Sequence, residues 1–387
     1  MGHAFELATA TRVIFGAGKA SLVGEWLSEL QLRRVLLVSG QDSARARVVS
    51  EPLDARGVAH QRFVVAGEPS VQRVRDGTEA CLAFAAEAVI AVGGGSAIDA
   101  GKAIAALAAA GSDPLDHLEV VGRGLPLSVR PLPFAALPTT AGTGAEVTRN
   151  AVLSSPEHGV KASLRSAWML PQLAIVDPDF LRGAPASVLR ASGLDALSQL
   201  IEPFVSVRAN PLSDALAREG LVRSCRSLEA AVLHGAGDAQ RDDLALASLF
   251  GGLCLANAGL GAVHGFAAPL GGMFEAPHGA VCAALLPHVM RENLRALRAR
   301  ADSQVMLTRY RELARILTSD PSAEPESGIA WVERLCRVLQ VPGLSAYGMQ
   351  LSHVPELVTK ASAASSMRGN SVVLHESELA EIARHAL

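Results

Sequence analysis

The chain is poor in aromatic residues, which make up 4% of its 387 residues, and it contains no run of lysine or arginine. A formal net charge of −3 gives no electrostatic reason to expect a nucleic-acid partner. A hydrophobic content of 49% with 19% charged residues excludes disorder as the main state. The length is enough for two or three domains with sizeable cores. We therefore expect a soluble, multi-domain protein that handles small molecules.

Cysteine is scarce, and its spacing excludes two kinds of site. The five cysteines are far apart, lie in apolar surroundings and form no CxxC pair: Cys81, Cys225, Cys254, Cys282 and Cys336. This pattern supports neither a disulfide framework nor a zinc site built from thiolates.

Targeting and membrane signals are also lacking. Residues 1–18 have neither the basic start nor the apolar stretch of a signal peptide. The uncharged segment 244–263 is long enough to span a bilayer. However, it contains several glycines and Asn257, and it runs into His264 without a basic flank. We interpret it as a buried helix that leads into a polar site, and we expect a cytoplasmic protein with no membrane partner.

Strand and helix patterns divide the chain into two parts. Continuous apolar runs, typical of buried parallel strands, occur at 34–40, 88–96, 133–140 and 173–181. Helical patterns accompany them at 21–31 and 97–110. Later segments have helical spacing and no convincing strand: 188–205, 211–233 and 239–260. The sequence therefore predicts an α/β domain with a Rossmann-like parallel sheet over residues 1–182 and an all-α domain over residues 183–387.

A glycine loop follows one of the predicted strands. Gly93, Gly94 and Gly95 lie between a strand and a helix, and Ser96 follows them. Glycine lets a ligand approach the backbone closely, and the free N–H groups of a helix's first turn attract anions. The pattern fits a pyrophosphate site, although it is not the GxGxxG fingerprint and does not follow the first strand. A tight strand–helix turn without a ligand is the alternative.

A second polar loop, PTTAGTGAEVT, begins at Pro138, near the end of the apolar run at 133–140. It gathers Thr139, Thr140 and Thr143 beside two glycines. Hydroxyls and exposed backbone amides suit the ribose and phosphates of a nucleotide. The alternative is a turn that only caps Glu146 and its helix.

The helical half carries candidate metal ligands. Asp195 and Gln199 are four residues apart, and therefore lie on one face of a helix. His264 and His278 follow, each with a glycine after it. One carboxylate and two imidazoles are a plausible ligand set for Fe²⁺ or Zn²⁺. Taken singly, Asp195 could be a helix cap and each histidine a core residue.

Five motifs, in order, resemble the iron-containing (group III) alcohol dehydrogenase family. They are GGGSAIDAGKAI, PTTAGTGAEVT, GLDAL, VHGFAAPLGG and PHGAVCAALLPHV, and the similarity runs from FGAGKASLVGEWL to SSMRGN. The resemblance implies an NAD(P)-binding α/β domain and a helical metal and substrate domain, with hydride transfer between an alcohol and an aldehyde or ketone. The partners we expect are a small alcohol or aldehyde and a second copy of the chain in a homodimer.

The resemblance also implies roles for single residues. Gly94, Gly95 and Ser96 match residues that hold the pyrophosphate, Thr139, Thr140 and Thr143 match residues that line the cofactor, and Lys161 would lie near the nicotinamide ribose. Asp195, His264 and His278 match three of the family's metal ligands. No separate catalytic base can be assigned.

Two departures from the family pattern concern the metal. Gln199 stands where the family has a histidine, and Ala268 stands where many members have a second histidine. An amide oxygen is a poorer ligand than imidazole for Fe²⁺ or Zn²⁺. Either the metal binds weakly through Asp195, Gln199, His264 and His278, or catalysis proceeds without it; we favour weak binding.

A third departure concerns the cofactor. Gly40 stands where many members have an acidic residue that contacts the ribose 2′-hydroxyl. Glycine does not repel a 2′-phosphate, and Arg45 and Arg47 follow closely. We therefore expect NADPH to bind at least as well as NADH, unless Asp42 replaces the acid.

Three other functions are compatible with these motifs. The nearest is a reductase similar to maleylacetate reductase, which does not strictly require metal. A lyase similar to dehydroquinate synthase would need a cluster of Lys and Arg for a substrate phosphate, and the segments around His264 and His278 show none. The third is a nucleotide-binding protein without catalysis.

Overall fold

The computed structural model describes residues 4–274, 276–300 and 303–387. Residue contacts divide them into two compact units. The sheet unit comprises Ala8–Thr140 and Gly144–Arg182. The helical unit comprises the described residues up to Leu7, Ala141–Thr143 and Gly183–Leu387. The short segment Ala141–Thr143, which the sequence division at residue 182 assigns to the first domain, thus groups with the helices.

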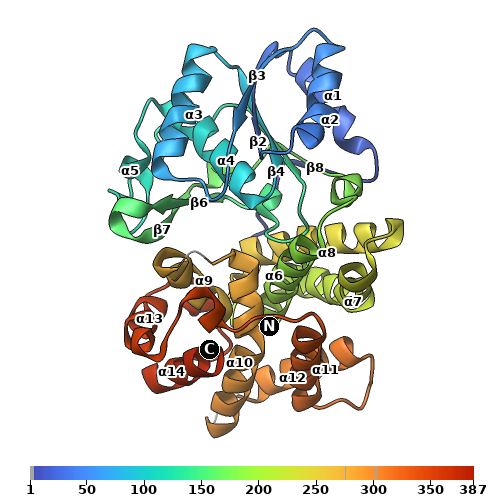
Figure 1. Cartoon of the computed structure of the whole chain (residues 1–387), viewed down its shortest axis with the longest axis vertical. Helices are drawn as coiled ribbons and strands as arrows, with labels where there is room; N and C mark the ends of the chain where they lie inside the picture. The colour runs from blue at the N-terminus through green and yellow to red at the C-terminus, as the bar shows by residue number, and fades with distance from the viewer. Residues whose placement is uncertain (1–3, 275, 301–302) are drawn as a thin grey trace. The chain divides into compact units, whose positions relative to one another are not determined.

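The sheet unit is built on a parallel six-stranded sheet (Figure 1). Its strands are β1 (Arg12–Phe15), β2 (Arg34–Ser39), β3 (Ala59–Val64), β4 (Ala88–Gly93), β5 (Phe134–Pro138) and β8 (Leu173–Val176). They are ordered β1–β8–β5–β4–β2–β3, and each neighbouring pair is parallel. The carboxyl ends of β2, β4 and β5 therefore lie side by side, and ligands of open α/β sheets bind at such ends.

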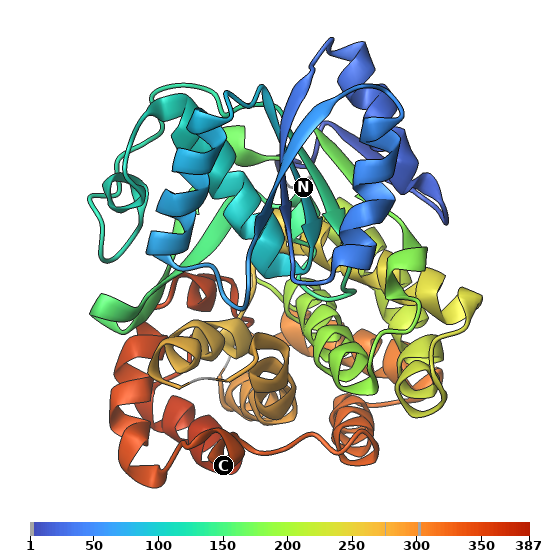
Figure 2. The same cartoon turned by 45° about the horizontal axis from the view of Figure 1, so that its top comes forward.

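Helices cover both faces of this sheet, because side chains alternate between the faces along each strand. On one face, Leu36 and Val38 pack with residues of α3 (Val71–Ala83) and α4 (Gly95–Ala110). On the other face, Val35 and Leu37 pack with residues of α1 (Val23–Glu29) and α2 (Ser43–Asp54). Figure 2 shows these helices on opposite sides of the strands. A short helix, α5 (Pro114–His117), follows α4.

An antiparallel hairpin of β6 (Asn150–Ser155) and β7 (Val160–Arg165) is a feature that the sequence did not predict. Its alternate residues, Ala151, Leu153, Ala162 and Leu164, join the core that α3 and α4 form. The segment carries mixed small and polar residues, so it lacks the continuous apolar pattern that marks β2, β4, β5 and β8.

The helical unit contains no strand among its described residues, as the sequence predicts. Its α-helices are α6 (Ala186–Phe204), α7 (Pro211–His234), α8 (Asp238–Ala258), α9 (Ala262–Met273), α10 (His278–Ala299), α11 (Gln304–Thr318), α12 (Pro325–Val338), α13 (Val354–Ser362) and α14 (Glu376–His385). Within the described chain no single helix is long and apolar enough to cross a membrane. Among the described helices, α8 and α9 are the one pair that together reaches that length and composition, and they are bent by 99° at the break between them.

Candidate active site and metal cluster

The glycine loop joins β4 to α4 at the carboxyl edge of the sheet. A Cβ on Gly93 would lie 2.6 Å from the Cβ of Ala97, so glycine is needed there for close packing. Gly94 is the N-cap residue of α4, and as a glycine it has no side chain to cap the helix's first turn. Gly94, Gly95 and Ser96 are half-buried. The first turn can therefore present backbone N–H groups to an anion.

The threonine loop begins at the end of β5, the neighbour of β4. The N–H of Thr139 donates to the carbonyl of Gly93 at 2.9 Å. A Cβ on Gly94 would lie 3.4 Å from Oγ1 of Thr140. The structure thus brings Thr139 and Thr140 to the glycine loop, whereas Thr143 groups with the helical unit.

Lys161 lies on β7 of the hairpin, with its side chain mostly buried. Its Nζ is 3.3 Å from Oε1 of Glu68, in the segment between β3 and α3. This ion pair places the ammonium group beside the segment between β3 and α3.

Gly40 follows β2 at the same edge of the sheet. A Cβ on Gly40 would meet nothing within 4 Å. The Oδ1 of Asp42 accepts from the N–H groups of Ala44 at 2.8 Å and Arg45 at 3.3 Å. Asp42 is therefore the N-cap of α2, and the Arg45 guanidinium lies 3.7 Å from it. Arg47 is exposed on α2.

Arg62 is a further charged residue at this edge, and sequence reasoning missed it. It lies on β3, whose neighbour is β2. Its Nε donates to Oγ of Ser39 at 2.7 Å, and its Nη2 donates to the carbonyl of Gly40 at 2.9 Å. The strand was not predicted because polar residues interrupt it, so no sequence pattern placed Arg62 beside Gly40.

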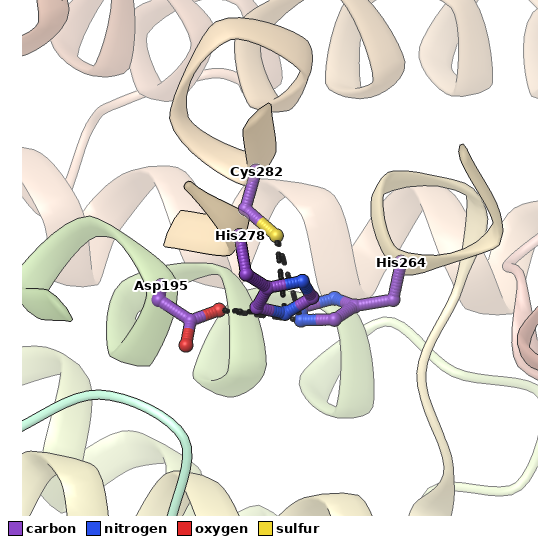
Figure 3. A group of neighbouring side chains, drawn as sticks. All are labelled: Asp195, His264, His278 and Cys282. Carbon is purple, nitrogen blue, oxygen red and sulfur yellow. Dashed lines mark hydrogen bonds and ion pairs between the residues drawn. The ribbon is translucent and has the colours of Figure 1, made fainter. Parts of the chain in front are cut away.

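The candidate metal ligands meet within the helical unit (Figure 3). Asp195 on α6 is 2% exposed. Its Oδ1 lies 3.4 Å from Nε2 of His264 on α9 and 3.5 Å from Nε2 of His278 on α10. Oδ1 of Asp195 has no hydrogen-bond partner among the described residues. A buried carboxylate oxygen that accepts no hydrogen bond and faces two ring nitrogens is an arrangement that a bound cation would satisfy.

Glycine at position 279 makes this meeting possible. A Cβ on Gly279 would lie 2.2 Å from the backbone oxygen of Ala191 and 3.2 Å from the Cβ of Asp195. Any side chain there would push the first turn of α10 away from α6. The glycine after His278 therefore has a packing role that brings the imidazole to the carboxylate.

Glu202 lies about two turns after Asp195 on α6 and contacts the far side of the His264 ring. Its Oε2 lies 2.6 Å from Nδ1 of His264, and its Oε1 accepts from the N–H of Val263 at 2.7 Å. A proton on Nδ1 leaves Nε2 available to a cation, and such carboxylate–histidine pairs are common behind metal ligands. The spacing of Asp195, Gln199 and Glu202 along one helix face was the sequence signal that could have identified this residue.

Cys282 completes the cluster, so the expectation that this cysteine has apolar surroundings is wrong. It lies one turn after His278 on α10 and is 0% exposed. Its Sγ is 3.7 Å from Nε2 of both His264 and His278. One ligand atom from each of the four residues lies within 4.8 Å of every other. The four-residue spacing of His278 and Cys282 was the available signal.

The pKa values of the two acidic members of the cluster, Asp195 and Cys282, are both lowered. Burial raises the pKa of Asp195, but His278 and His264 outweigh it, and the net pKa of the carboxyl is lowered. Burial likewise raises the pKa of Cys282, but the adjacent imidazoles His264 and His278 lower it on balance. Cys282 and Asp195 in turn raise the pKa of His278 to about 9, and the pKa of His264 is raised despite its burial. A bound cation would therefore replace protons on these rings between two acidic groups.

Gln199 lies beside this cluster and is 2% exposed. Its Nε2 donates to the carbonyl of Gly142 at 3.3 Å, while its Oε1 has no partner among the residues described. Ala268, one turn after His264, is exposed and offers no group for proton transfer.

Sequence and structure comparisons agree on one family. Residues 10–178 match the profile described as "Iron-containing alcohol dehydrogenase", and residues 190–387 match "Fe-containing alcohol dehydrogenase family, C-terminal". The 1,3-propanediol dehydrogenase of Klebsiella pneumoniae is 34% identical over 381 residues, which cover 96% of each chain.

Solved structures give the same result. A crystal structure of a 1,3-propanediol oxidoreductase superposes with a TM-score of 0.90 at 30% identity, covering 100% of both chains. The sulfoacetaldehyde reductase of Bifidobacterium kashiwanohense, solved in complex with NAD⁺, gives a TM-score of 0.86 at 25% identity, covering 100% of this chain and 99% of that one.

Fold and comparisons together define an oxidoreductase of the alcohol–aldehyde type. The chain belongs to the iron-containing alcohol dehydrogenase family. The resemblance seen in the five sequence motifs, and the α/β plus all-α fold it implied, are therefore confirmed.

Proposed function

We propose that the protein interconverts a small alcohol and the corresponding aldehyde or ketone, with NAD(P) in the sheet unit and a divalent metal in the helical unit. The observation that carries the proposal is Oδ1 of Asp195, a buried oxygen without a hydrogen bond among the described residues, which lies 3.4 Å from Nε2 of His264 and 3.5 Å from Nε2 of His278. In a chain of this family, that atom supports a metal-assisted reaction.

The cofactor's pyrophosphate would bind at the first turn of α4. This turn would offer the backbone N–H groups of Gly94, Gly95 and Ser96, and the two glycines have no side chain that would block access to them. Thr139 and Thr140 lie next to this loop. Thr143 and Lys161 stay proposed contacts from the family resemblance. Lys161 carries a fixed positive charge on the hairpin through its ion pair with Glu68.

The donor set fits Fe²⁺ or Zn²⁺. Asp195, His264 and His278 provide one carboxylate and two imidazoles, a combination suited to either ion. A bound divalent cation supplies Lewis acidity to the oxygen of the alcohol or carbonyl. Glu202 holds a proton on Nδ1 of His264 and keeps its Nε2 directed at Asp195. His278 has a side chain 37% exposed, so it forms the solvent-facing side of the cluster.

NADPH is the cofactor that the sheet edge favours. Gly40 leaves open space where an acidic side chain would repel a 2′-phosphate. Arg62 adds a guanidinium beside the Gly40 carbonyl, held there by hydrogen bonds to Ser39 and Gly40. Arg45 is less suited to that role, because it lies against Asp42.

A panel of aldehydes and alcohols, assayed with NADPH and NADH and with or without added Fe²⁺ or Zn²⁺, tests this proposal. We expect reversible hydride transfer that added metal increases. Reduction that is fully independent of metal would instead support the activity similar to maleylacetate reductase. Binding of NAD(P)H without turnover of any substrate would contradict the proposal.

We also expect the protein to form a homodimer and to be located in the cytoplasm. Sedimentation analysis tests the oligomeric state.

A further inference from the structure

Cys282 lies where a fourth metal ligand would lie. Its Sγ points from α10 into the space that Asp195, His264 and His278 enclose (Figure 3). The sulfur is equally distant, at 3.7 Å, from the Nε2 atoms of the two histidines. Because the thiol is fully buried, its chemistry depends on these neighbouring side chains and not on solvent.

Four of the six distances among the donor atoms match those of a tetrahedral site, and the other two are at most 4.8 Å. Zinc binds imidazole nitrogen and carboxylate oxygen at roughly 2.0–2.2 Å and thiolate sulfur at about 2.3 Å. Tetrahedral angles then place sulfur and nitrogen about 3.6 Å apart and nitrogen and oxygen about 3.4 Å apart. The observed separations are 3.7 Å from sulfur to each nitrogen, and 3.4 and 3.5 Å from the Asp195 oxygen to the nitrogens.

Cys254, a second buried cysteine of the helical unit, gives a comparison for the surroundings of Cys282. Cys254 on α8 is also fully buried, but its Sγ donates to the backbone carbonyl of Ser213 at 3.3 Å. Among the described residues Cys254 belongs to no group of possible metal ligands. Cys282 differs because its hydrogen-bond contacts are two ring nitrogens, and both of these also face the carboxylate of Asp195.

Gln199 is a weak ligand for a late first-row metal, so tight binding would depend more on a sulfur ligand. Its amide nitrogen is engaged with the carbonyl of Gly142, which leaves only a neutral oxygen for a cation. A neutral amide oxygen is a weaker ligand for late first-row metals than either imidazole or thiolate. A ligand set that relied on Gln199 would therefore bind Zn²⁺ more weakly than one that includes Cys282.

We propose that Cys282 is the fourth protein ligand of the metal, so that the ligand set is Asp195, His264, His278 and Cys282, with Gln199 outside it. The inference rests on the proposed function only in taking this cluster as the metal site. On binding, the thiol releases its proton to solvent and its sulfur binds the cation as a thiolate. The soft sulfur directs the site toward Zn²⁺ and Co²⁺ and away from Mg²⁺ and Mn²⁺.

Cobalt titration of the full-length, chelator-treated protein tests this inference, because a Co²⁺–thiolate bond gives an intense near-ultraviolet charge-transfer band. We expect that band to grow with Co²⁺ until one ion per chain is bound. In Cys282→Ser the band should disappear and the affinity for Co²⁺ should fall at least about tenfold. Gln199→Ala should keep the band and bind Co²⁺ within about threefold of the parent. Cys225→Ser, whose thiol lies outside the cluster, is the matched control and should behave as the parent.

A second measurement, the alkylation of Cys282, uses the parent protein and needs no substitution in the cluster. Mass spectrometry after alkylation should show Cys282 protected when Zn²⁺ is bound and modified after chelation under mildly denaturing conditions. The inference is overturned if Co²⁺ binds without the band, if the band persists in Cys282→Ser, or if Zn²⁺ leaves the alkylation of Cys282 unchanged. These readouts involve no turnover. A charge-transfer band in a protein that transfers no hydride would therefore reject the proposed reaction while supporting the ligand.

Discussion

Glu202 and His264 form a buried carboxylate–imidazole pair, with Oε2 and Nδ1 separated by 2.6 Å. The other oxygen of Glu202 accepts from the N–H of Val263, so the carboxylate is fixed to the first turn of α9. This arrangement sets both the rotation of the His264 ring and the nitrogen that carries its proton.

Removing the charge of Glu202 should weaken the metal site. We expect Glu202→Gln to lower the affinity for Zn²⁺ about 10–100-fold, because residues that orient a metal ligand typically contribute that much. Dialysis against a competing chelator, followed by metal analysis, measures the change. Glu219→Gln, at a half-exposed ion pair on α7, is the control. Equal Zn²⁺ affinity in Glu202→Gln and the parent would show that the pair does not orient a ligand.

A methyl group at position 279 should separate α10 from α6. In Gly279→Ala the new Cβ would lie 2.2 Å from the Ala191 oxygen, which is backbone and cannot move aside cheaply. We expect a loss of about 1–3 kcal/mol in the free energy of unfolding, together with weaker metal binding as His278 moves. Urea titration and metal analysis measure the two effects.

Gly237→Ala is the control for that variant, because its Cβ would meet only the end of the flexible Gln240 side chain. If Gly279→Ala bound metal like the parent, the position of His278 would not depend on this packing.

Cofactor preference should respond to a single acid at the sheet edge. Gly40→Asp has space for its side chain, since a Cβ there meets nothing within 4 Å. The carboxylate should repel a 2′-phosphate and shift the ratio of NADPH to NADH affinity by at least about tenfold, or about 1.4 kcal/mol. Fluorescence titration with each cofactor measures the ratio. A parent protein that binds NADH tenfold more tightly than NADPH would contradict the assignment of Gly40.

Glu146 should make stability depend on pH. It is buried in the sheet unit, its Oε1 has no partner among the described residues, and burial raises its pKa to about 7. The folded protein therefore holds a proton that the unfolded chain loses near pH 4.5, so stability falls as the pH rises from about 4.5 to 7.

Glu146→Gln removes this dependence. The variant should be more stable than the parent at pH 8 by up to about 3 kcal/mol, and the difference should shrink toward pH 5. Unfolding measured at both pH values, with the exposed Glu157→Gln as control, gives the result. A difference in stability that does not vary with pH would mean that Glu146 does not titrate in this range.

Sequence patterns predicted the parts of the fold whose side chains are uniformly apolar or have helical periodicity. Strands β2, β4, β5 and β8 are continuous apolar runs because helices cover both of their faces. The hairpin of β6 and β7 was missed because only one of its faces joins the core, so its residues alternate. Strand β3 was missed for a similar reason, and Arg62 with it.

The metal cluster was predicted in part. Asp195, His264 and His278 match the family's metal ligands, whereas the resemblance gives no ligand role to Cys282, although it lies in the motif PHGAVCAALLPHV. A role for Cys282 is visible only where three helices converge at one point. Four-residue spacing put Cys282 and His278 on one face of α10, but spacing alone could not show that His264 faces the same point.

The most direct test of the account measures metal content and hydride transfer in the same samples. Chelator-treated protein is reloaded stepwise with Zn²⁺ or Fe²⁺, and NADPH-dependent aldehyde reduction is measured at each metal occupancy, with Asp195→Asn treated in parallel. The account predicts that the rate rises in proportion to occupancy up to one ion per chain, and that Asp195→Asn neither retains the ion nor gains the rate. A full reduction rate in metal-free protein, unchanged by Asp195→Asn, would contradict it.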